Sequence, residues 1–463
     1  MMVRVFGHYV SKAYLMLGLA EFLACLLALV LGAHLRFSGV LPELEEGSYS
    51  LWATAVLFAA LMSASMLSVG LYQRGLRLSG GLLVRIGLSF LFASMAMSLS
   101  FYAVPGLFVG RGVLGFALLV SLLLLLLLRT LFYRTAGDEV RKHRVLVLGS
   151  GNHAKMILDL EAESDSFTVV GFVQLHDSED VIAPERRVNL QGTLLDYAVQ
   201  CEVDEVVIAV DDRRRRISVQ ELLDCKMNGI AVLDLPSFFE KEAACIRIDM
   251  LTPGWLLTAS GFRARALGQY GKRVLDVIGA LVGIVLTAPL MLATVLAIRW
   301  EAGWRGPVLY HQTRVGLNGR RFNLHKFRSM RTDAEADGQA RWAQLNDNRV
   351  TRVGGFIRKT RLDELPQLFN VLRGEMSLVG PRPERPEFVD KFSQTINFYN
   401  ERHRVLPGLT GWAQLCYQYG SSEDDAREKL QYDLYYVKNT SFFLDLIILL
   451  ETVEVVLWGK GAR

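Results

Sequence analysis

The chain has 463 residues, too many for a single hydrophobic core, so several domains are expected. Its hydrophobic fraction of 51% and mean hydropathy of +0.26 are high for a soluble protein, which indicates a membrane portion. The net charge of +4 is unremarkable as a total, and the five scattered cysteines contain no C-x-x-C pair. This cysteine pattern argues against a zinc site or a disulfide framework and suits a reducing compartment.

Four apolar runs dominate the first 135 residues, and each is close to the roughly 20 residues that a helix needs to cross a membrane. The runs are Ala13–Leu31, Leu51–Leu71, Ile86–Val104 and Val113–Phe132. We predict a four-helix transmembrane bundle over residues 1–135. A cleaved signal peptide is the alternative for the first run, but no small-residue cleavage site follows it and further spans do. The runs hold almost no ionisable residues, so they do not indicate a transport pathway.

The charged residues around these runs predict their orientation. Basic residues precede the first run, separate the second from the third and follow the fourth: Arg4, Lys12, Arg74, Arg77, Arg85, Arg134, Arg141, Lys142 and Arg144. The segment between the first two runs carries acidic residues instead: Glu43, Glu45 and Glu46. By the positive-inside rule, both ends of the bundle lie in the cytoplasm.

Residues 143–237 alternate short strands with helices, which predicts a small α/β domain with a parallel sheet. The strands are expected at 144–148, 167–173, 205–210 and 230–235. After the first strand, a G-x-G-x-x-A turn opens a helix, so Gly149 and Gly151 are candidate nucleotide-binding residues. The second strand ends at Gln174 without the acidic residue that would bind a ribose. A structural or regulatory domain therefore stays open beside a nucleotide-binding one.

Residues 238–268 have a mixed composition with turn signals and are interpreted as a linker. The last region, residues 269–463, begins with an apolar run over residues 272–300 that carries basic residues at both ends, which is the cytoplasmic signature. Pro289 lies inside the run, where proline costs a helix about 3 kcal/mol and bends or breaks it. We therefore predict a re-entrant helix, with a plain kinked span as the alternative. Asp276 lies one turn beyond Lys272, so the two can neutralise each other at the lipid boundary.

Two further segments, 306–312 and 320–330, flank Asn318-Gly319, the strongest short signal for a β-hairpin. The second arm ends in Lys326-Phe327-Arg328-Ser329-Met330, which brings two cations to a strand end. Lys326 and Arg328 are therefore candidates for the rim of a phosphate site. An ordinary basic strand end is the alternative.

The segment 361–383 combines an acidic pair with a short apolar helix and a rigid Pro-Arg-Pro turn. Asp363 and Glu364 precede Pro366, which is tolerated in a first helical turn, so the pair is expected at a helix N-terminus. Free backbone N–H groups there favour a carboxylate or a phosphate, although a plain N-cap role for Asp363 is the alternative. Four arginines surround the pair and suit a doubly charged phosphate: Arg358, Arg361, Arg373 and Arg382.

Residues 356–383, F-I-R-K-T-R-L-D-E-L-P-Q-L-F-N-V-L-R-G-E-M-S-L-V-G-P-R-P, and the K-F-R-S-M at 326–330 resemble the bacterial sugar transferases that load a phosphosugar onto polyprenyl phosphate, the monotopic phosphoglycosyl transferases. The resemblance extends from about Lys272 to the C-terminus, and the upstream part resembles large, multi-domain members. It implies a multi-domain membrane protein with a four-helix transmembrane bundle, a Rossmann-like α/β domain, and a mixed α/β catalytic domain with a re-entrant membrane helix. The anchor residues would be Lys272, Arg273, Asp276 and Pro289.

The resemblance also implies the chemistry. Asp363 would attack the β-phosphate of a UDP-sugar, release UMP and pass the phosphosugar to polyprenyl (undecaprenyl) phosphate, which would start an exopolysaccharide, capsule or O-antigen. The metal ligands for Mg²⁺ would be Asp363 and Glu364. The phosphate-binding cations would be Arg358, Arg382, Lys326 and Arg328, with Pro381 and Pro383 holding Arg382 rigid.

The resemblance further implies a protein of the bacterial inner membrane, in contact with membrane lipid, with its α/β domains in the cytoplasm. A homodimer is expected, and no nucleic-acid partner. Two rival functions stay open. A membrane glycosyltransferase would release UDP without a covalent intermediate, and a nucleotide-sugar-modifying enzyme working at residues 149–154 would need a Tyr-x-x-x-Lys or comparable set, which the α/β domain lacks.

Overall fold

The computed structural model describes residues 2–5, 8–37, 51–72, 80–135, 142–164, 166–174, 181–190, 192–211, 218–251, 261–262, 266–304, 306–331, 349–417 and 422–457. The chain divides into two compact units, one formed mainly by residues 9–244 and the other mainly by residues 245–463. The first unit holds four apolar helices and a parallel sheet. The second holds a long bent helix and a mixed α/β fold.

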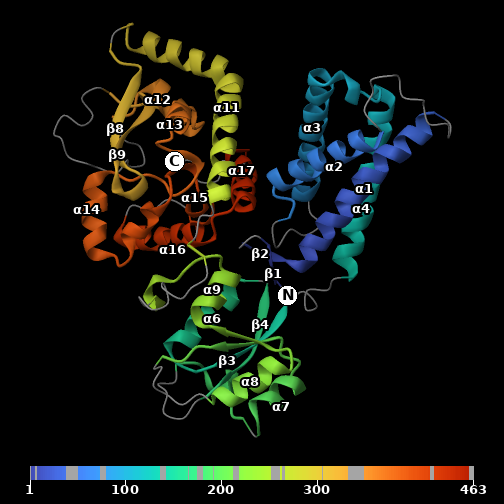
Figure 1. The fold of residues 1–463 in the computed structure, drawn as a ribbon, viewed down its shortest axis with the longest axis vertical. Coiled ribbons are helices and arrows are strands. Elements are labelled where there is room, and N and C mark those ends of the chain that lie inside the picture. The colour runs from blue at the N-terminus through green and yellow to red at the C-terminus, as the bar shows by residue number, and fades with distance from the viewer. Residues whose placement is uncertain are drawn as a thin grey trace. The chain divides into compact units, whose positions relative to one another are not determined.

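Four apolar helices form the first part of the N-terminal unit: α1 (Lys12–Arg36), α2 (Leu51–Ser68), α3 (Gly80–Ala103) and α4 (Arg111–Thr135). A β1–β2 ladder precedes them (Met2–Val5 and His8–Ser11), and the 3₁₀ turn η1 (Pro105–Leu107) lies between α3 and α4. Helix α1 packs against α2 and α4, and α2 packs against α3, around a core that includes Phe58, Met62 and Leu125 (Figure 1). The four predicted apolar helices are confirmed, and each is long and apolar enough to cross a membrane.

A buried ion pair lies among these helices, where the sequence predicts almost no ionisable side chains. Arg129 donates to both carboxylate oxygens of Glu21, at 2.7 and 3.0 Å. Tyr72 also donates to Glu21, at 2.6 Å, and Arg129 donates to the Leu71 carbonyl at 3.0 Å. Because each charged group is paired and hydrogen-bonded, the pair can be buried at modest cost, and it fixes α1 against α4.

The rest of the N-terminal unit is a five-stranded parallel sheet of order β5-β4-β3-β6-β7. Its strands are β3 (His143–Leu148), β4 (Phe167–Val173), β5 (Arg187–Val188), β6 (Glu205–Ile208) and β7 (Ala231–Asp234), and its helical segments are α6 (Asn152–Glu163), η2 (Pro184–Arg186), α7 (Leu194–Gln200), α8 (Val219–Met227) and α9 (Leu235–Glu242). In Figure 1, α6 and α9 cover one face of the sheet, and α7 and α8 cover the other. The predicted parallel sheet is confirmed, and α9 continues past the expected boundary at residue 237.

The C-terminal unit combines many short elements with three longer helices. Its segments are η3 (Ile248–Met250), α11 (Ala266–Glu301), β8 (Leu309–Val315), η4 (Leu317–Gly319), β9 (Arg321–Phe327), α12 (Arg352–Lys359), η5 (Leu362–Glu364), α13 (Gln367–Arg373), β10 (Ser377–Val379), α14 (Pro386–Thr395), η6 (Tyr399–Arg404), β11 (Gly408–Thr410), α15 (Trp412–Cys416), α16 (Glu423–Asn439) and α17 (Phe442–Leu457). The predicted hairpin is confirmed, because β8 and β9 pair antiparallel and Asn318 and Gly319 in the turn have φ values of 52° and 78°. Strands β10 and β11 form a separate parallel pair.

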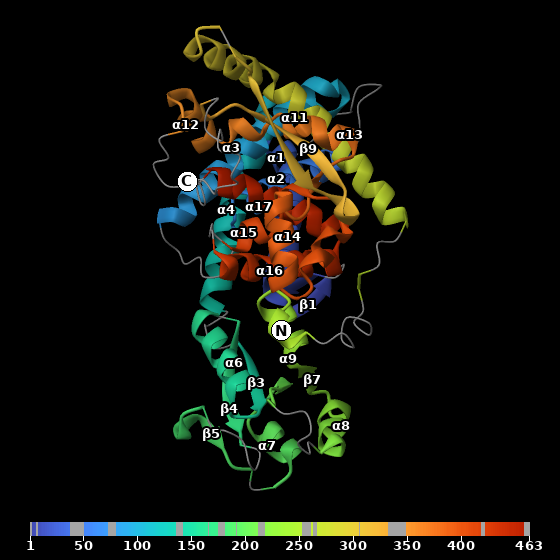
Figure 2. The ribbon, with the colours of Figure 1, turned by 90° about the vertical axis from the view of Figure 1, so that its left-hand side faces the viewer.

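Helix α11 is one helix with Pro289 inside it, and Figures 1 and 2 both draw it with a bend. A straight helix of its 36 residues would be about 54 Å long, far more than a hydrocarbon layer about 30 Å thick. Pro289 favours the bend by removing a helical hydrogen bond, and the hydroxyls of Thr287 and Thr294, which donate to carbonyls four residues earlier, favour it further. Val285 and Leu286 are 72% and 68% exposed, as expected of a helix surrounded by lipid.

Replacing Arg129 with Met should lower the free energy of unfolding by about 3–5 kcal/mol, because Glu21 then stays buried without its counter-charge. Thermal unfolding of the full chain in detergent measures the change. Arg111→Met, at an exposed position of α4, is the matched control and should leave the midpoint nearly unchanged. Adding Glu21→Leu to Arg129→Met should recover most of the loss. If Arg129→Met unfolds at the wild-type temperature, the pair does not stabilise the helices.

Candidate active site

The acidic pair predicted to carry the chemistry lies in the 3₁₀ turn η5, directly before helix α13. Arg361 precedes this turn in the left-handed conformation, with φ of 60°, and separates it from α12. Pro366 has helical backbone angles and leads the chain from the turn into α13. The pair therefore lies one short turn ahead of α13, at the helix N-terminus where the sequence predicts it.

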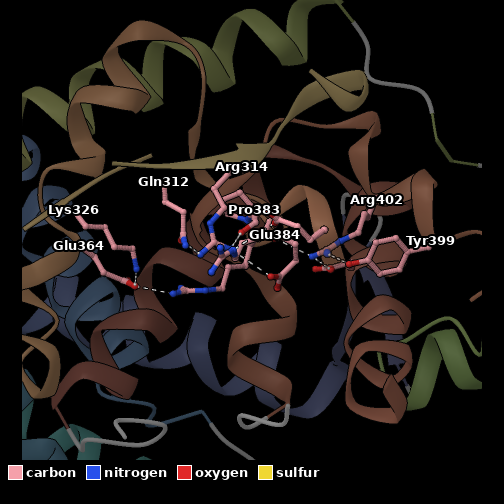
Figure 3. A network of polar contacts seen from close by, with 12 residues as sticks. Gln312, Arg314, Lys326, Glu364, Pro383, Glu384, Tyr399 and Arg402 are labelled. Carbon is pink, nitrogen blue, oxygen red and sulfur yellow. Dashed lines mark hydrogen bonds and ion pairs between the residues drawn. The ribbon is translucent and has the colours of Figure 1, made fainter. Parts of the chain in front are cut away.

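Glu364 is the more tightly held member of the pair. Its Oε1 atom accepts a hydrogen bond from Lys326 Nζ at 2.8 Å and another from the Arg382 guanidinium at 2.8 Å (Figure 3). Burial alone would raise the pKa of Glu364, but the charges of Arg382 and Lys326 outweigh this effect and hold the pKa well below its usual range. Glu364 is therefore ionised and fixed in position.

Asp363 has a different environment. It is 8% exposed, and the part of the chain that the structure describes supplies no hydrogen-bond donor to its carboxylate. Burial raises the pKa of Asp363, and the negative charge of Glu364 adds to this effect, while nearby cations oppose it. A carboxylate with a raised pKa and no donors is more basic than an ordinary aspartate, which suits a nucleophile.

Lys326 is positioned by the contact between strand β9 and helix α13. Asn370, fully buried on α13, donates to the Asn323 carbonyl at 2.8 Å and accepts from the His325 backbone N–H at 3.1 Å. This side chain therefore bonds to β9 as a neighbouring strand would. It fixes the end of β9 that carries Lys326 beside the turn that carries Glu364.

Arg382 is positioned through the backbone of the Pro-Arg-Pro turn. The carbonyls of residues 381–383 accept, in order, from Gly408 N at 2.9 Å, from Arg402 at 3.0 Å and from Arg314 at 3.0 Å. Arg402 is itself buried and pairs with Asp433 at 2.7 Å. Figure 3 shows Arg402 and Arg314 approaching Pro383 from different sides, while the link between Lys326 and Glu364 lies at the other end of the same network.

Three glycines bring β11 close enough to hold this turn. A Cβ atom on Gly408 would lie 2.1 Å from Gly380 N, and one on Gly411 would lie 2.2 Å from Gly380 O. Real side chains do not tolerate such distances, so only glycine allows β10 and β11 to approach this closely. The P-G-x-T-G sequence at residues 407–411 is thereby explained as a packing requirement.

Polar residues at the start of α11 bind the elements next to the acidic pair. Lys272 donates to the last carbonyl of β10 at 2.9 Å and pairs with Asp445 at 2.8 Å. Arg273 donates to two carbonyls at the end of α13, both at 2.7 Å. Asp276 accepts from a hydroxyl and a backbone N–H of β10, both at 2.9 Å. The expected neutralisation of Asp276 by Lys272 is therefore wrong, because each has another partner.

The other predicted cations lie elsewhere. Arg358 is half-buried on α12 and makes no ion pair with Asp363 or Glu364, all three of which the structure describes. The Arg328 guanidinium lies against Gly306, where an added Cβ would come within 2.7 Å of it. Arg373 donates to His325 at 2.6 Å. Of the four predicted phosphate-binding cations, Lys326 and Arg382 are therefore the two that contact the acidic pair.

The predicted nucleotide-binding glycines, Gly149 and Gly151, lie in the N-terminal unit. Asp211 accepts from the first two backbone N–H groups of α6, those of Asn152 and His153, both at 2.8 Å. A Cβ atom on Gly151 would lie 2.0 Å from the Asp211 carboxylate. The chain's own carboxylate thus caps the helix where the sequence predicts a nucleotide phosphate.

Arg314 and Arg402 are absent from the sequence-based prediction. Arg402 lies in a polar stretch with other charged residues, which is typical of a solvated surface, and Arg314 belongs to no motif. The available signal was Asp433, an acid within the largely apolar stretch 430–437, since a buried acid requires a cationic partner.

Residues 267–459 match a family model described as bacterial sugar transferase. The chain is 44% identical over 242 residues to the UDP-N-acetylgalactosamine-undecaprenyl-phosphate N-acetylgalactosaminephosphotransferase of Aeromonas hydrophila. The aligned region covers 52% of this chain and 56% of that relative. The chain is also 43% identical over 270 residues to the undecaprenyl-phosphate glucose phosphotransferase of Komagataeibacter xylinus, covering 56% of this chain and 50% of the relative. The match therefore spans about half the length of these two proteins.

A longer match, 32% identical over 372 residues, joins the chain to the UDP-glucose:undecaprenyl-phosphate glucose-1-phosphate transferase of Xanthomonas campestris pv. campestris. It covers 76% of this chain and 75% of that relative. The similarity therefore reaches well upstream of the residues that match the family model.

Replacing Lys272 with Met should lower the midpoint of thermal unfolding, because Asp445, which is 1% exposed, loses its counter-charge. Breaking a buried pair in this way costs about 3–5 kcal/mol. Lys359→Met, at an exposed position on α12, is the control and should unfold like the wild type. An unchanged midpoint for Lys272→Met would mean that α11 is held to the site by other contacts.

Proposed function

Because this chain belongs to the bacterial sugar transferase family, we propose that it transfers a sugar 1-phosphate from a UDP-sugar to undecaprenyl phosphate and releases UMP. The observation that carries the proposal is the difference in environment between the two carboxylates of the acidic pair. Glu364 is neutralised by Lys326 and Arg382, whereas Asp363 is buried without a donor among the described residues. One carboxylate is thus placed to organise charge and the other to react.

Asp363 is the nucleophile in this proposal. One of its oxygens attacks the β-phosphorus of the donor, the bond from that phosphorus to the bridging oxygen breaks, and UMP leaves with this oxygen. An oxygen of undecaprenyl phosphate then attacks the same phosphorus and displaces Asp363, which restores the carboxylate. The product is an undecaprenyl diphosphate-sugar, a starting unit for a cell-surface polysaccharide. Dividing the transfer into two steps through an acyl phosphate lowers each barrier.

The cations of the site answer the main difficulty of this reaction, which is that an anion must approach a diphosphate. Lys326 and Arg382 balance the two carboxylates, so the pair does not repel the substrate as a net negative charge. Arg358, which has no ion pair within the described residues, is free to bind the diphosphate when it arrives. Hydrogen bonds to the carbonyls of residues 381–383 fix the backbone of the Pro-Arg-Pro turn, and this keeps the Arg382 side chain beside Glu364.

The same carboxylates fit Mg²⁺, which binds through one or two carboxylates together with substrate phosphate oxygens. Both oxygens of Asp363 are free of donors among the described residues, while Glu364 Oε1 is already shared by Lys326 and Arg382. We propose that Asp363 and the second oxygen of Glu364 hold the ion. When bound, it would neutralise charge on the diphosphate.

The two rival functions are less well supported. A glycosyltransferase that releases UDP needs no free buried carboxylate beside two cations. A nucleotide-sugar-modifying enzyme would bind its nucleotide at α6, where the Asp211 carboxylate already accepts the N-terminal N–H groups and would repel a phosphate.

We further propose that α1 to α4 form a transmembrane bundle in the bacterial inner membrane, and that α11 enters and leaves the membrane by the cytoplasmic face. The bend at Pro289 and the apolar, exposed surface of α11 support this arrangement. A shallow position would hold the acidic pair near the headgroups, where the acceptor phosphate lies. A homodimer completes the proposal.

Asp363→Asn should abolish UMP release from a panel of UDP-sugars, because the amide keeps the size of the side chain but cannot act as the nucleophile. Glu364→Gln should reduce the rate and leave some activity, since it removes only the charge that positions Lys326 and Arg382. The matched control is Asp390→Asn, an exposed aspartate on α14. Release of UDP by the wild type, or full activity of Asp363→Asn, would refute the proposal.

The pH dependence of UMP release should report the raised pKa of Asp363. Because the ionised carboxylate reacts, the rate of UMP release without acceptor should fall with acid at a pH above the range of an ordinary aspartate. Lys326→Met removes a cation that lowers this pKa, so the acid limb should move to higher pH. Lys359→Met should leave it in place. If the acid limb does not move in Lys326→Met, then Lys326 does not influence the pKa of Asp363.

Cysteine labelling of whole cells tests the re-entrant helix. Gly271 lies near the start of α11 and Pro307 lies six residues after its end, so Gly271→Cys and Pro307→Cys should both react with an impermeant label only after lysis. Wild-type protein corrects for the native cysteines. Labelling of one position in intact cells would instead indicate a helix that spans the membrane.

A further inference from the structure

A second cluster of ionisable side chains lies in the N-terminal unit, at the end of the sheet opposite Gly149. His143 begins β3, Glu205 begins β6 and Glu242 ends α9. The three residues are 5%, 2% and 9% exposed. Such burial is unusual for two carboxylates, so their charge must be compensated locally.

The polar atoms of this cluster converge without satisfying one another. His143 Nε2 lies 3.3 Å from Glu205 Oε2 and 3.4 Å from Glu242 Oε1. Within the described part of the chain, His143 Nε2, Glu205 Oε1 and Glu242 Oε1 have no hydrogen-bond partner. Leaving a buried polar atom unpaired costs about 1–3 kcal/mol, so three together point to a missing ligand.

Neighbouring groups hold all three side chains, and Glu205 Oε2, the oxygen nearest His143 Nε2, is the one that Lys241 contacts. His143 Nδ1 lies 2.9 Å from the Ser166 carbonyl and can bond to it only as a donor, which leaves Nε2 of the neutral ring with its lone pair facing the carboxylates. Ser166 Oγ donates to Glu242 Oε2 at 2.6 Å, and Lys241 donates to Glu205 Oε2 at 2.5 Å. Metal-binding histidines and carboxylates are oriented in this way by neighbours in proteins.

We propose that His143, Glu205 and Glu242 form a binding site for a divalent metal ion of the zinc class. Around a tetrahedral ion with ligand distances of about 2.0–2.1 Å, neighbouring ligand atoms lie roughly 3.3–3.4 Å apart. The two measured separations from His143 Nε2 agree with this spacing. One imidazole and two carboxylates are a donor set that zinc accepts.

Lys241 is the cation that balances the carboxylates in this arrangement. Its ammonium lies 2.5 Å from Glu205 and 3.4 Å from Glu242, and its side chain is 14% exposed, so it has a route to solvent. Exchange of the ammonium for a divalent ion leaves the two carboxylates fully balanced. The bound ion would join the starts of β3 and β6 to the end of α9, which is a structural role.

The test is zinc retention by the full chain in detergent, stripped with a chelator and then given one equivalent of Zn²⁺ in excess Mg²⁺, which competes for the carboxylates of the other unit. Elemental analysis after desalting should find one equivalent more in the wild type than in His143→Gln. His153→Gln, a half-exposed histidine in the same domain, is the matched control and should retain the wild-type amount.

Two further variants make the outcome independent of how well His143→Gln folds. Lys241→Met removes the competing cation and should bind zinc more tightly. Ser166→Ala removes a supporting hydrogen bond and should weaken binding about tenfold to a hundredfold. If the wild type retains no more zinc than His143→Gln, or if Lys241→Met does not bind more tightly, the cluster is a closed ion-pair network with a protonated histidine and the metal site is refuted.

Discussion

The arrangement of the acidic pair depends on two hydrogen bonds to one atom, Glu364 Oε1, which accepts from both Lys326 and Arg382. Lys326 reaches it from the β8–β9 hairpin and Arg382 from the turn after β10, so one carboxylate joins two segments far apart in the chain. Hydrogen bonds to charged groups contribute about 1.5–3 kcal/mol each, which makes this a strong link. Because Glu364 takes both cations, Asp363 stays without a donor among the described residues.

The first turns of α11 hold two elements next to the acidic pair, strand β10 and helix α13. Lys272 and Asp276 bind the backbone of β10, and Arg273 binds the last carbonyls of α13. Helix α11 and the acidic pair are therefore joined within this unit through β10 and α13. A change in the tilt of α11 within this unit would therefore displace β10 and α13, the elements next to the acidic pair.

Local patterns predicted the parts of the molecule that local forces determine. The apolar runs, the parallel strands and the Asn318-Gly319 hairpin follow from periodicity and turn chemistry, and the acidic pair from its neighbours in sequence. Arg402, Asp433 and Arg314 could not be predicted, because their partners lie in other elements. The position of Arg328 could not be predicted either, because its guanidinium lies against Gly306 and not against the acidic pair. The expectation of no zinc site rested on cysteine spacing, and it stays a prediction beside the site proposed at His143, Glu205 and Glu242.

Isotope exchange tests most directly whether Asp363 becomes covalently linked to the phosphosugar. Labelled UMP is incubated with UDP-sugar and acceptor-free wild-type chain, and with Asp363→Asn as the matched variant. A two-step reaction predicts label in UDP-sugar for the wild type and none for Asp363→Asn, because the first step runs in both directions without acceptor. If the wild type transfers sugar phosphate to undecaprenyl phosphate but never exchanges UMP without it, the phosphosugar passes directly from donor to acceptor and Asp363 is not the nucleophile.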